Sequence, residues 1–329
     1  MNYSKSVALI GSAISWGSSR LLGEAGPRSL HAFGLDQILQ TRGVAAHWYQ
    51  IVEARPRCSD HTLTHQIEAL PFVTAHAQRL ASAVYHAMTC DQFPVTVGGD
   101  HSTAIGHYAG LLQYLATQVT QSAAEETRDR PSDSSRPSDV SRLADITTSH
   151  LGIIWIDAHA DCNRLETSPS MACHGMALAA VLGYGTPELT QWFGRRPIRP
   201  ENVCLIGTRT VDPGEQEFID QHQIRVFSPA DIHQRGWVAI LNEAVAIATH
   251  NTQGFGLSID LDAFDPVEAP GVAFPEPNGI YAAEFQASLP ILLQHARLIG
   301  IEISEYAPEH DIEHQTAHLI SNILSSRQQ

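Results

Sequence analysis

Cysteine, basic side chains and long apolar runs are all scarce in this chain of 329 residues. Its five cysteines are odd in number and form no Cys-x-x-Cys pair, which argues against a disulfide scaffold and favours a reducing compartment. Lysine and arginine total 20 against 35 acidic residues, so the formal net charge is −15, and no net cationic field exists to attract nucleic acid or an anionic membrane. No stretch approaches the roughly 20 apolar residues of a membrane span. We therefore expect a soluble cytoplasmic protein.

The composition is nevertheless that of a globular protein. Hydrophobic residues make up 43% of the chain and charged residues 17%, which provides enough apolar surface for a sizeable core and argues against a disordered chain. The acidic excess suits a cationic ligand or bound metal ions, although acids on a solvated surface explain it equally well. The choice between these interpretations depends on where the acids and the 18 histidines lie.

Short, β-branched apolar runs alternate with amphipathic stretches, which is typical of α/β proteins. The predicted strands are Val7–Ile10, Trp48–Val52, Pro94–Val97, Gly152–Ile156, Asn202–Ile206, Ile224–Phe227, Phe255–Ile259 and Leu298–Ile303. The predicted helices include Leu63–Met88, Ser102–Ala116, Ala239–Ala248, Ala282–His295 and Gln315–Ser325. Continuous apolar strands separated by helices imply a parallel sheet covered on both faces. We predict a three-layer αβα fold with a mostly parallel central sheet of about eight strands.

One segment interrupts this pattern. Residues 122–149 are rich in Ser, Asp, Arg, Glu and Pro and have almost no aromatic or aliphatic content. Such a segment cannot bury enough apolar area to offset its ordering entropy, so we expect a flexible surface insertion rather than a linker between domains. The motifs described next lie on both sides of it, which favours a single domain over residues 1–329.

The first polar motif, GGDHS at residues 98–102, follows a predicted strand and opens a helix. Two glycines let the backbone turn sharply and approach a site, and His101 then projects from the C-terminal end of the strand. The same segment also fits an ordinary helix start, with Asp100 or Ser102 as the cap.

The second motif, DAHAD at residues 157–161, is more specific. Side chains alternate along an extended chain, so Asp157, His159 and Asp161 are predicted to face the same way. Three ionisable groups at the end of a buried strand would repel and desolvate one another without a cation. We interpret the motif as a metal site rather than a polar strand end that faces solvent.

The third motif, SIDLD at residues 258–262, repeats this device with Asp260 and Asp262. The three motifs together supply two imidazoles and four carboxylates, which suits two divalent cations with shared carboxylates better than one ion. Oxygen-rich ligation with some imidazole and no thiolate favours two Mn²⁺ over Zn²⁺, although Co²⁺, Ni²⁺ or Fe²⁺ could occupy the same geometry. Paired ions lower the pKa of a bridging water and so supply a hydroxide nucleophile at neutral pH.

The motifs GGDHS, DAHAD and SIDLDAFDP resemble those of the ureohydrolases, the family of arginase, agmatinase and formimidoylglutamase. The resemblance extends from residues 17–20 to Glu305 and is closest to arginase through residues 161–163, 166–170, 174–176 and 212–215. It implies six metal ligands, two of them bridging. They are His101 and Asp161 for the first ion, His159 and Asp262 for the second, and Asp157 and Asp260 as bridges.

The resemblance also assigns two residues to catalysis. His174 matches the proton-shuttling histidine of the family, and a histidine near a metal centre has a pKa suited to protonating a leaving amine. A core or helix-capping histidine before Gly175 is the alternative. Glu305 matches the carboxylate that pairs with the guanidinium and orients its central carbon for attack. Glu302 lies nearby in sequence, but the Pro that follows favours Glu305.

On the substrate side, Asn163, Asp212 and Glu215 match the arginase pattern, and the first two match residues that contact the α-carboxylate and α-amino group. Two segments depart from it. Ser170-Met171-Ala172-Cys173 stands where an arginase usually has a polar Ser-Gly-Asn element, and Phe274 stands where a Thr is usual. Both changes remove hydrogen-bonding groups, which leaves the substrate open.

The resemblance implies a binuclear metal amidinohydrolase that forms a homo-oligomer, a trimer or a hexamer. L-Arginine, cleaved to L-ornithine and urea by a metal-bridging hydroxide, is the leading substrate. Another guanidino acid, N-hydroxyarginine, agmatine and formimidoylglutamate are the alternatives, although Asn163 and Asp212 argue against agmatine. A non-catalytic binding subunit is the alternative of a different class. Cys162 and Cys173, which flank motif residues, are interpreted as small fillers rather than redox-sensitive thiols.

Overall fold

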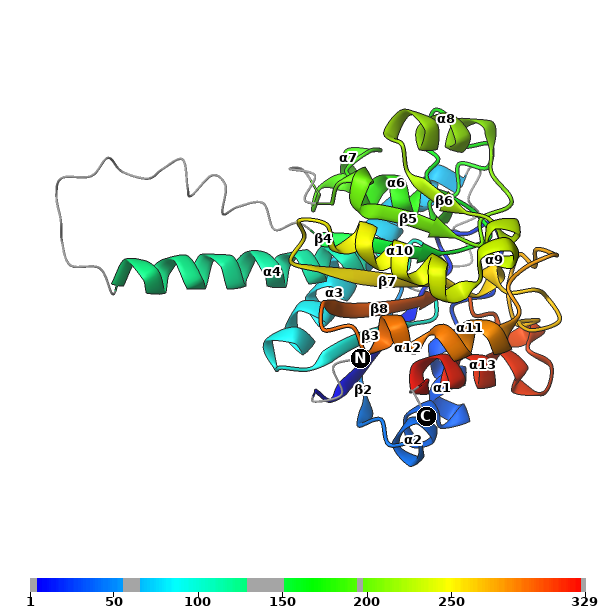
Figure 1. The fold of residues 1–329 in the computed structure, drawn as a ribbon, viewed down its shortest axis with the longest axis horizontal. Helices are drawn as coiled ribbons and strands as arrows, with labels where there is room; N and C mark the ends of the chain where they lie inside the picture. Colours follow the sequence, from blue (N-terminus) through cyan, green and yellow to red (C-terminus); the bar gives the residue numbers. More distant parts are fainter. Residues whose placement is uncertain (1–4, 56–65, 129–150, 194–197, 327–329) are drawn as a thin grey trace.

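A single parallel sheet organises the computed structural model, which describes residues 5–55, 66–128, 151–193 and 198–326 (Figure 1). All registered strand pairs are parallel, and the strand order is β2-β1-β3-β8-β7-β4-β5-β6. The strands are β1 Val7–Ala13, β2 Ala46–Glu53, β3 Phe93–Val97, β4 Leu151–Ile156, β5 Val203–Ile206, β6 Arg225–Phe227, β7 Gly254–Asp260 and β8 Leu298–Ser304. Each predicted strand is present, and the predicted three-layer α/β fold is confirmed.

Helices cover both faces of the sheet and form two separate apolar cores. One face is covered by α1 Gly26–Phe33, α2 Leu35–Thr41, α9 Pro229–Arg235, α10 Trp237–Thr249, α11 Ala282–Ser288, α12 Pro290–Leu293 and α13 Gln315–Ser325. The other face is covered by α3 Leu70–Thr89, α4 Thr103–Arg128, α6 Ala177–Val181, α7 Pro187–Thr190 and α8 Pro213–His222. Within the described ranges, no helix is both long and apolar enough to cross a membrane.

Three predicted helices have clearly different bounds in the structure. Within the predicted helix Leu63–Met88, residues 66–69 form a 3-10 turn and α3 begins at Leu70. The segment Ala282–His295 forms two helices, because Pro290 lacks the amide hydrogen that a continuous helix needs, and the second helix begins at this residue. Helix α4 continues to Arg128 and extends away from the sheet, so residues 122–128 of the predicted insertion are helical (Figure 1). Residues 129–149 of that insertion lie outside the described residues, and its flexibility stays a prediction.

The four central strands bring the sequence motifs together. Strands β3, β8, β7 and β4 are consecutive neighbours in the sheet. The segment with His101 follows β3, Asp157 follows β4, Asp260 ends β7 and Glu305 follows β8. Because these strands are parallel, all four segments leave the sheet at the same edge, where open α/β sheets bind ligands.

Candidate metal centre

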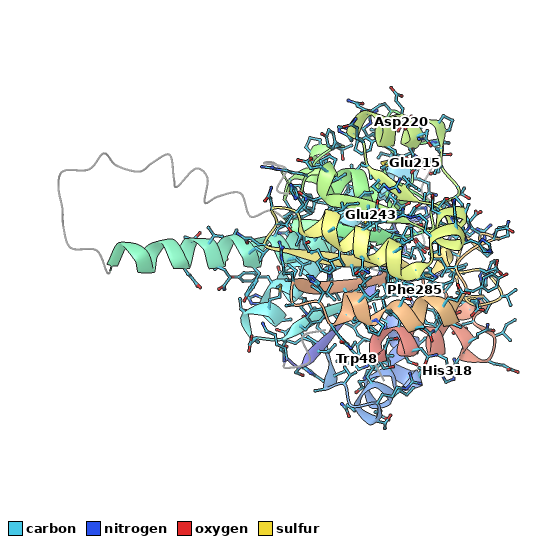
Figure 2. The ribbon with its side chains drawn as sticks, viewed as in Figure 1. Trp48, Glu215, Asp220, Glu243, Phe285 and His318 are labelled. Atoms are coloured by element: carbon cyan, nitrogen blue, oxygen red, sulfur yellow. The ribbon has the colours of Figure 1, made fainter. Side chains whose placement is uncertain are left out.

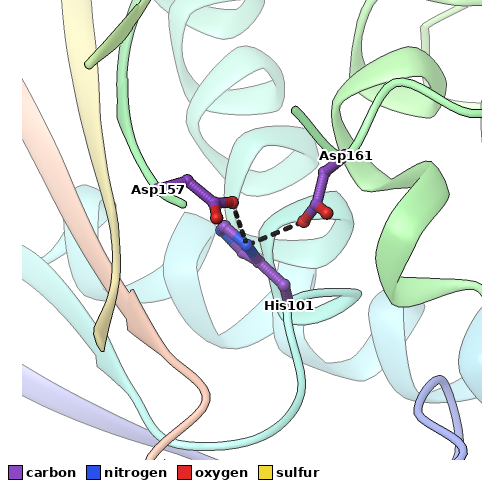
Figure 3. Close-up of side chains that lie close together, drawn as sticks. All are labelled: His101, Asp157 and Asp161. Atoms are coloured by element: carbon purple, nitrogen blue, oxygen red, sulfur yellow. Dashed lines mark ion pairs between the residues drawn. The ribbon is translucent and has the colours of Figure 1, made fainter. Parts of the chain in front are cut away.

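His101 lies at the centre of a buried carboxylate cluster (Figure 3). Its Nδ1 atom lies 3.1 Å from Asp157 Oδ2, 2.8 Å from Asp161 Oδ2 and 3.0 Å from Asp260 Oδ2. The His101 ring stacks on Trp155, with ring centroids 4.3 Å apart, and the indole Nε1 donates a 2.9 Å hydrogen bond to Asp157 Oδ2. One nitrogen and three carboxylate oxygens therefore converge on one point.

A second group lies on the other side of Asp157. Nδ1 of His159 is 3.6 Å from Asp157 Oδ1 and 3.1 Å from Asp262 Oδ2. The two oxygens of Asp157 thus face different histidines, and Asp157 belongs to both groups of closely spaced ligand atoms. His159 is the more accessible histidine, because its side chain is 27% exposed whereas that of His101 is fully buried. The cluster has an inner and an outer half that share one carboxylate.

Both aspartate-rich motifs lie at or just beyond the ends of their strands, so the predicted strand alternation is wrong for them. β4 ends at Ile156, and Asp161 adopts a left-handed φ of 50°. β7 ends at Asp260, whose Oδ1 accepts a 2.9 Å hydrogen bond from the Asp262 amide at the start of a short 3-10 turn. Turns, rather than a period of two, direct these side chains to one point. His101 is likewise placed by a turn, since Gly98 and Gly99 both have positive φ.

The carboxylates of this cluster are buried close together, so ionisation of one makes ionisation of the others less favourable. Burial and the neighbouring aspartates raise the pKa of Asp161 and of Asp260. Burial also raises the pKa of Asp262, to about 6, with Asp157 adding to this effect and His159 opposing it. Asp157 is the exception, because its interactions with the two histidines outweigh its burial and lower its pKa. Ionising all four carboxylates together therefore requires added positive charge.

The donor set fits divalent cations. Nδ1 of His101 is buried and makes no hydrogen bond to any described residue, although three carboxylates surround it, so it can act as a ligand atom. Imidazole nitrogen and carboxylate oxygen without thiolate form a ligand set that suits Mn²⁺ and related ions. The inner group, His101 with Asp157 and Asp161, and the outer group, Asp157 with His159 and Asp262, each offer three such atoms.

Glu305 and His174 lie beside the inner half. Glu305 follows β8 with a left-handed φ of 62°, and its Oε1 accepts a 2.9 Å hydrogen bond from the backbone amide of His101. The same oxygen lies 3.1 Å from Nδ1 of His174. The backbone amide of His174 donates to the carbonyl of Gly17, which ties this loop to the N-terminal segment. The carboxylate of Glu305 and the imidazole of His174 are thus paired, and this pair lies directly beside His101, a candidate metal ligand.

This pair has shifted protonation equilibria. Burial lowers the pKa of His174, but the hydrogen bond and charge of Glu305, together with Asp161 and Asp100, outweigh it and raise the pKa to about 9. Burial raises the pKa of Glu305, but the hydrogen bond and charge of His174 outweigh burial, so the pKa of Glu305 is lowered. The pair therefore holds an imidazolium beside a carboxylate at neutral pH.

The predicted substrate residues form a separate polar network. Asn163 Nδ2 donates to Asp212 Oδ2 at 2.8 Å, and Thr167 Oγ1 donates to Asn163 Oδ1 at 3.0 Å. Glu215 lies on α8 at the edge of the molecule (Figure 2), where its Oε2 accepts from the Asp212 amide and its Oε1 from the Cys162 amide. Glu215 thus closes a capping box and joins α8 to the loop after Asp161. Its contact with substrate stays a prediction.

The chain matches the family model "Arginase family" over residues 5–327. It belongs to the arginase family. It is 33% identical to the arginase of Brevibacillus brevis over 324 residues, which cover 98% of this chain and 97% of that protein. It is 34% identical to the arginase of Bacillus caldovelox over 262 residues, covering 79% of this chain and 77% of that protein. The native structure of an arginase from Bacillus caldovelox superimposes with a TM-score of 0.82 at 30% identity, covering 98% of this chain and 97% of that one.

Family membership confirms the predicted class of enzyme, a hydrolase that acts on guanidino compounds. Within this arginase-type ureohydrolase, the two unusual segments lie close to the candidate catalytic pair. The Phe274 ring is 5.5 Å from the His174 ring, and the guanidinium of Arg20 lies over Phe274 at 4.7 Å. Ala172 and Cys173 are buried. Side chains with little hydrogen-bonding capacity therefore occupy both segments near His174.

The thiols of Cys162 and Cys173 are both buried in this arginase-family protein. Burial raises the pKa of Cys173 to about 12, with Asp100 adding to the effect, and raises the pKa of Cys162 well above its ordinary value. Both thiols stay protonated at neutral pH, which agrees with their interpretation as fillers.

Several residues that support the centre were not identified from the sequence. Nε2 of His101 lies 2.9 Å from Ser258 Oγ, which in turn donates a 2.6 Å hydrogen bond to the buried carboxylate of Glu302. Arg209 also supports the outer half, because its guanidinium donates to backbone oxygens of three separate segments. These oxygens belong to Gly207, Asp262, Ala263, Glu276 and Pro277. Ser258 belongs to the third motif and Glu302 was weighed only as an alternative to Glu305, so neither had this supporting role. Arg209 lies in no motif, and its partners are brought together only by the fold.

Proposed function

We propose that this chain is a binuclear manganese amidinohydrolase that cleaves L-arginine to L-ornithine and urea. The observation that supports the proposal most strongly is the shared carboxylate Asp157, which faces both histidines of two overlapping ligand groups. A paired carboxylate and imidazole, Glu305 and His174, lie at the edge of the same cluster. The arginase relatives that match nearly the whole chain support arginine as the substrate.

Two cations would be held by the ligands already described. His101 and Asp161 would hold the inner ion, His159 and Asp262 the outer ion, and Asp157 and Asp260 would serve both. When bound, two such ions lower the pKa of a water molecule between them and so supply a nucleophile at neutral pH.

Glu305 would bind and orient the guanidinium of the substrate. Its Oε1 is used by the His101 amide and by His174, whereas no described residue donates a hydrogen bond to its Oε2. A carboxylate that is paired with a planar guanidinium fixes the orientation of that group. The central carbon of the guanidinium is thereby placed for attack. The lowered pKa of Glu305 keeps this group ionised at neutral pH.

His174 would supply the proton that the departing amine needs. Water adds to the guanidinium carbon, the bond from this carbon to the side-chain nitrogen breaks, and His174 protonates the leaving nitrogen. Of the two protons of the water, one returns to His174 and one goes to the amine, so that urea and an ammonium group are the products. The Nδ1 atom of His174 is engaged by Glu305, so the proton on Nε2 is available to the leaving nitrogen. The raised pKa of about 9 keeps that proton in place at neutral pH.

A panel of substrates tests the proposal. We expect the Mn²⁺-loaded protein to release ornithine and urea from L-arginine faster than it releases the amine product from agmatine, N-hydroxyarginine, another guanidino acid or formimidoylglutamate. Amine products are measured by chromatography, because formimidoylglutamate would yield formamide instead of urea. Faster cleavage of another compound would replace arginine as the substrate, and no cleavage of any compound would show that the chain is not an amidinohydrolase.

Replacement of Asn163 by alanine tests recognition of the amino-acid end of the substrate. Loss of a hydrogen bond to a charged group costs about 1.5–3 kcal/mol, so we expect the KM for L-arginine to rise about 10- to 100-fold with a smaller change in kcat. Agmatine lacks the carboxylate, so its turnover should change little. The control is Asn242→Ala on the exposed side of α10. Equal losses for both substrates would contradict a role for Asn163 in binding the carboxylate.

A further inference from the structure

We propose that Glu276 is a positioning residue for His159 and that it sets the affinity of the outer cation site. The inference rests on the proposed binuclear centre. Glu276 follows the apolar segment around Phe274, in a loop with no recognisable metal motif. Its side chain is partly buried, with 28% exposure, and lies against the outer histidine.

The two nitrogens of His159 face different carboxylates. Nδ1 faces Asp157 and Asp262 at the candidate metal centre, at 3.6 and 3.1 Å. Nε2 points away from the centre and lies 3.7 Å from Glu276 Oε1. This distance is a charge contact rather than a hydrogen bond, but it places a carboxyl group beside the nitrogen that does not face the cation. A proton on Nε2 is thereby stabilised, and the lone pair of Nδ1 is left for a metal ion.

The carboxylate of Glu276 is held in this position from two sides. Thr210 Oγ1 donates a 3.0 Å hydrogen bond to Glu276 Oε2. Arg209 Nη2 donates to the backbone oxygen of Glu276 at 2.7 Å and to that of Asp262 at 2.9 Å. The same guanidinium therefore fixes the loop of Glu276 and the loop of a candidate ligand of the outer ion. Glu276 does not face His159 as a freely rotating surface side chain.

The inner histidine has an equivalent arrangement. His101 also presents Nδ1 to the carboxylates, and its Nε2 contacts Ser258 Oγ, which is hydrogen-bonded to Glu302. Each histidine thus has a carboxylate near its Nε2 atom, Glu302 at 3.5 Å from His101, with Ser258 between them as a hydrogen-bonding partner of both, and Glu276 at 3.7 Å from His159. Glu302 is fully buried, whereas Glu276 is partly exposed. Glu276 can therefore be substituted without leaving a cavity in the core, whereas Glu302 cannot.

Carboxylates behind metal-binding histidines fix the tautomer and the ring orientation and raise ligand basicity. Their loss typically weakens metal binding by about 10- to 100-fold. Because Glu276 contacts His159 and has no described contact with His101, this loss should fall on one of the two ions. Glu276 would therefore make the outer site depend on a residue outside the three ligand motifs.

The test is a calorimetric titration of the metal-free full chain with Mn²⁺. We expect the parent chain to bind two ions, and Glu276→Gln to bind one of them about 10- to 100-fold more weakly while the other is unchanged. Thr210→Val should cause a smaller loss in the same site, because the carboxylate loses its hydroxyl anchor. Thr210→Ser, which keeps the hydroxyl, should bind like the parent. The double variant Glu276→Gln with Thr210→Val should be no weaker than Glu276→Gln alone.

Glu284→Gln, an exposed carboxylate change on α11, is the matched control. If Glu276→Gln binds both ions as tightly as this control, the proposed role of Glu276 is wrong although the binuclear centre stands. Equal weakening of both ions, or a lower melting temperature of the metal-free Glu276→Gln variant, would make Glu276 a structural residue and also overturn the proposal. A parent chain that fails to bind two ions would overturn the binuclear centre itself, and with it the role of Glu276.

Discussion

Replacement of Asp161 by alanine is expected to lower product release by more than about 100-fold and to abolish tight binding of one Mn²⁺. Loss of a residue that is hydrogen-bonded to a metal ligand typically lowers metal affinity or activity by about 10- to 100-fold. Loss of a direct ligand should exceed that range. Asp161 Oδ2 lies 2.8 Å from His101 Nδ1, and these two atoms belong to the inner group of three ligands. The measurements are the rate of urea release and the metal content after removal of free Mn²⁺.

The backbone at Asp161 calls for a second variant. Its φ of 50° is left-handed, a conformation that costs alanine about 1–2 kcal/mol but that asparagine tolerates better. Asp161→Asn keeps the shape and the backbone preference and removes the charge, so it should lose the inner ion as well. Asp220→Ala, on the exposed part of α8 labelled in Figure 2, is the surface control. Unchanged turnover and two bound ions in both Asp161 variants would remove this residue from the ligand set.

The strands could be predicted from the sequence because each is a short apolar run between polar segments. Six of the eight cover the predicted runs and extend them by no more than a few residues, as with β1, which continues to Ala13. The other two, β5 and β6, each begin one residue after the predicted start. The strand order could not be predicted in this way. The neighbours β3 and β8 come from distant parts of the chain, and pairing over such a separation leaves no periodicity in either segment. The meeting of the motifs at one site was therefore expected from their residue types and from the family resemblance, and not from the strand order.

The metal motifs were recognised for their residue types, although the geometric reason was wrong. Alternation along a strand was used to place Asp157 and Asp161 on one side, whereas the chain has left the strand and Asp161 reaches the cluster through a left-handed turn. The clustering of acids and imidazoles was a sufficient signal, because such a group is too costly to bury without a cation. Composition at the ends of buried strands was thus more informative than periodicity.

Supporting residues could not be found from the sequence, because their roles depend on contacts across the fold. Thr210 and Glu276 are 66 residues apart, and neither lies in a recognisable pattern. Glu215 shows the converse. Its place in a family-like segment predicts a substrate contact, which stays a prediction, and in the structure both of its oxygens accept backbone hydrogen bonds. A sequence pattern identifies a position, and only the contacts show which groups remain available for a ligand.

Replacement of His174 by glutamine is expected to lower kcat about 10²- to 10⁴-fold, the usual contribution of a general acid. Glutamine retains a hydrogen-bonding side chain of similar length but cannot supply a proton to the leaving amine. Metal binding should not change, because the pairing partner of His174 is Glu305 and not a candidate ligand. His233→Gln on the exposed side of α9 is the control. A variant with full kcat would exclude His174 as the acid.

The pH profile gives a second test of the same residue. The pKa of His174 is raised to about 9, mainly by Glu305 against the effect of burial, so the imidazolium is present below that pH and is lost as the pH rises through it. The kcat/KM of the parent chain should therefore fall above about pH 9, because this parameter reports the free enzyme. A bound guanidinium shares Glu305 and repels the imidazolium, so the fall in kcat should occur at lower pH than the fall in kcat/KM. His174→Gln should lose this alkaline limb, and a limb that persists unchanged in the variant would belong to another group.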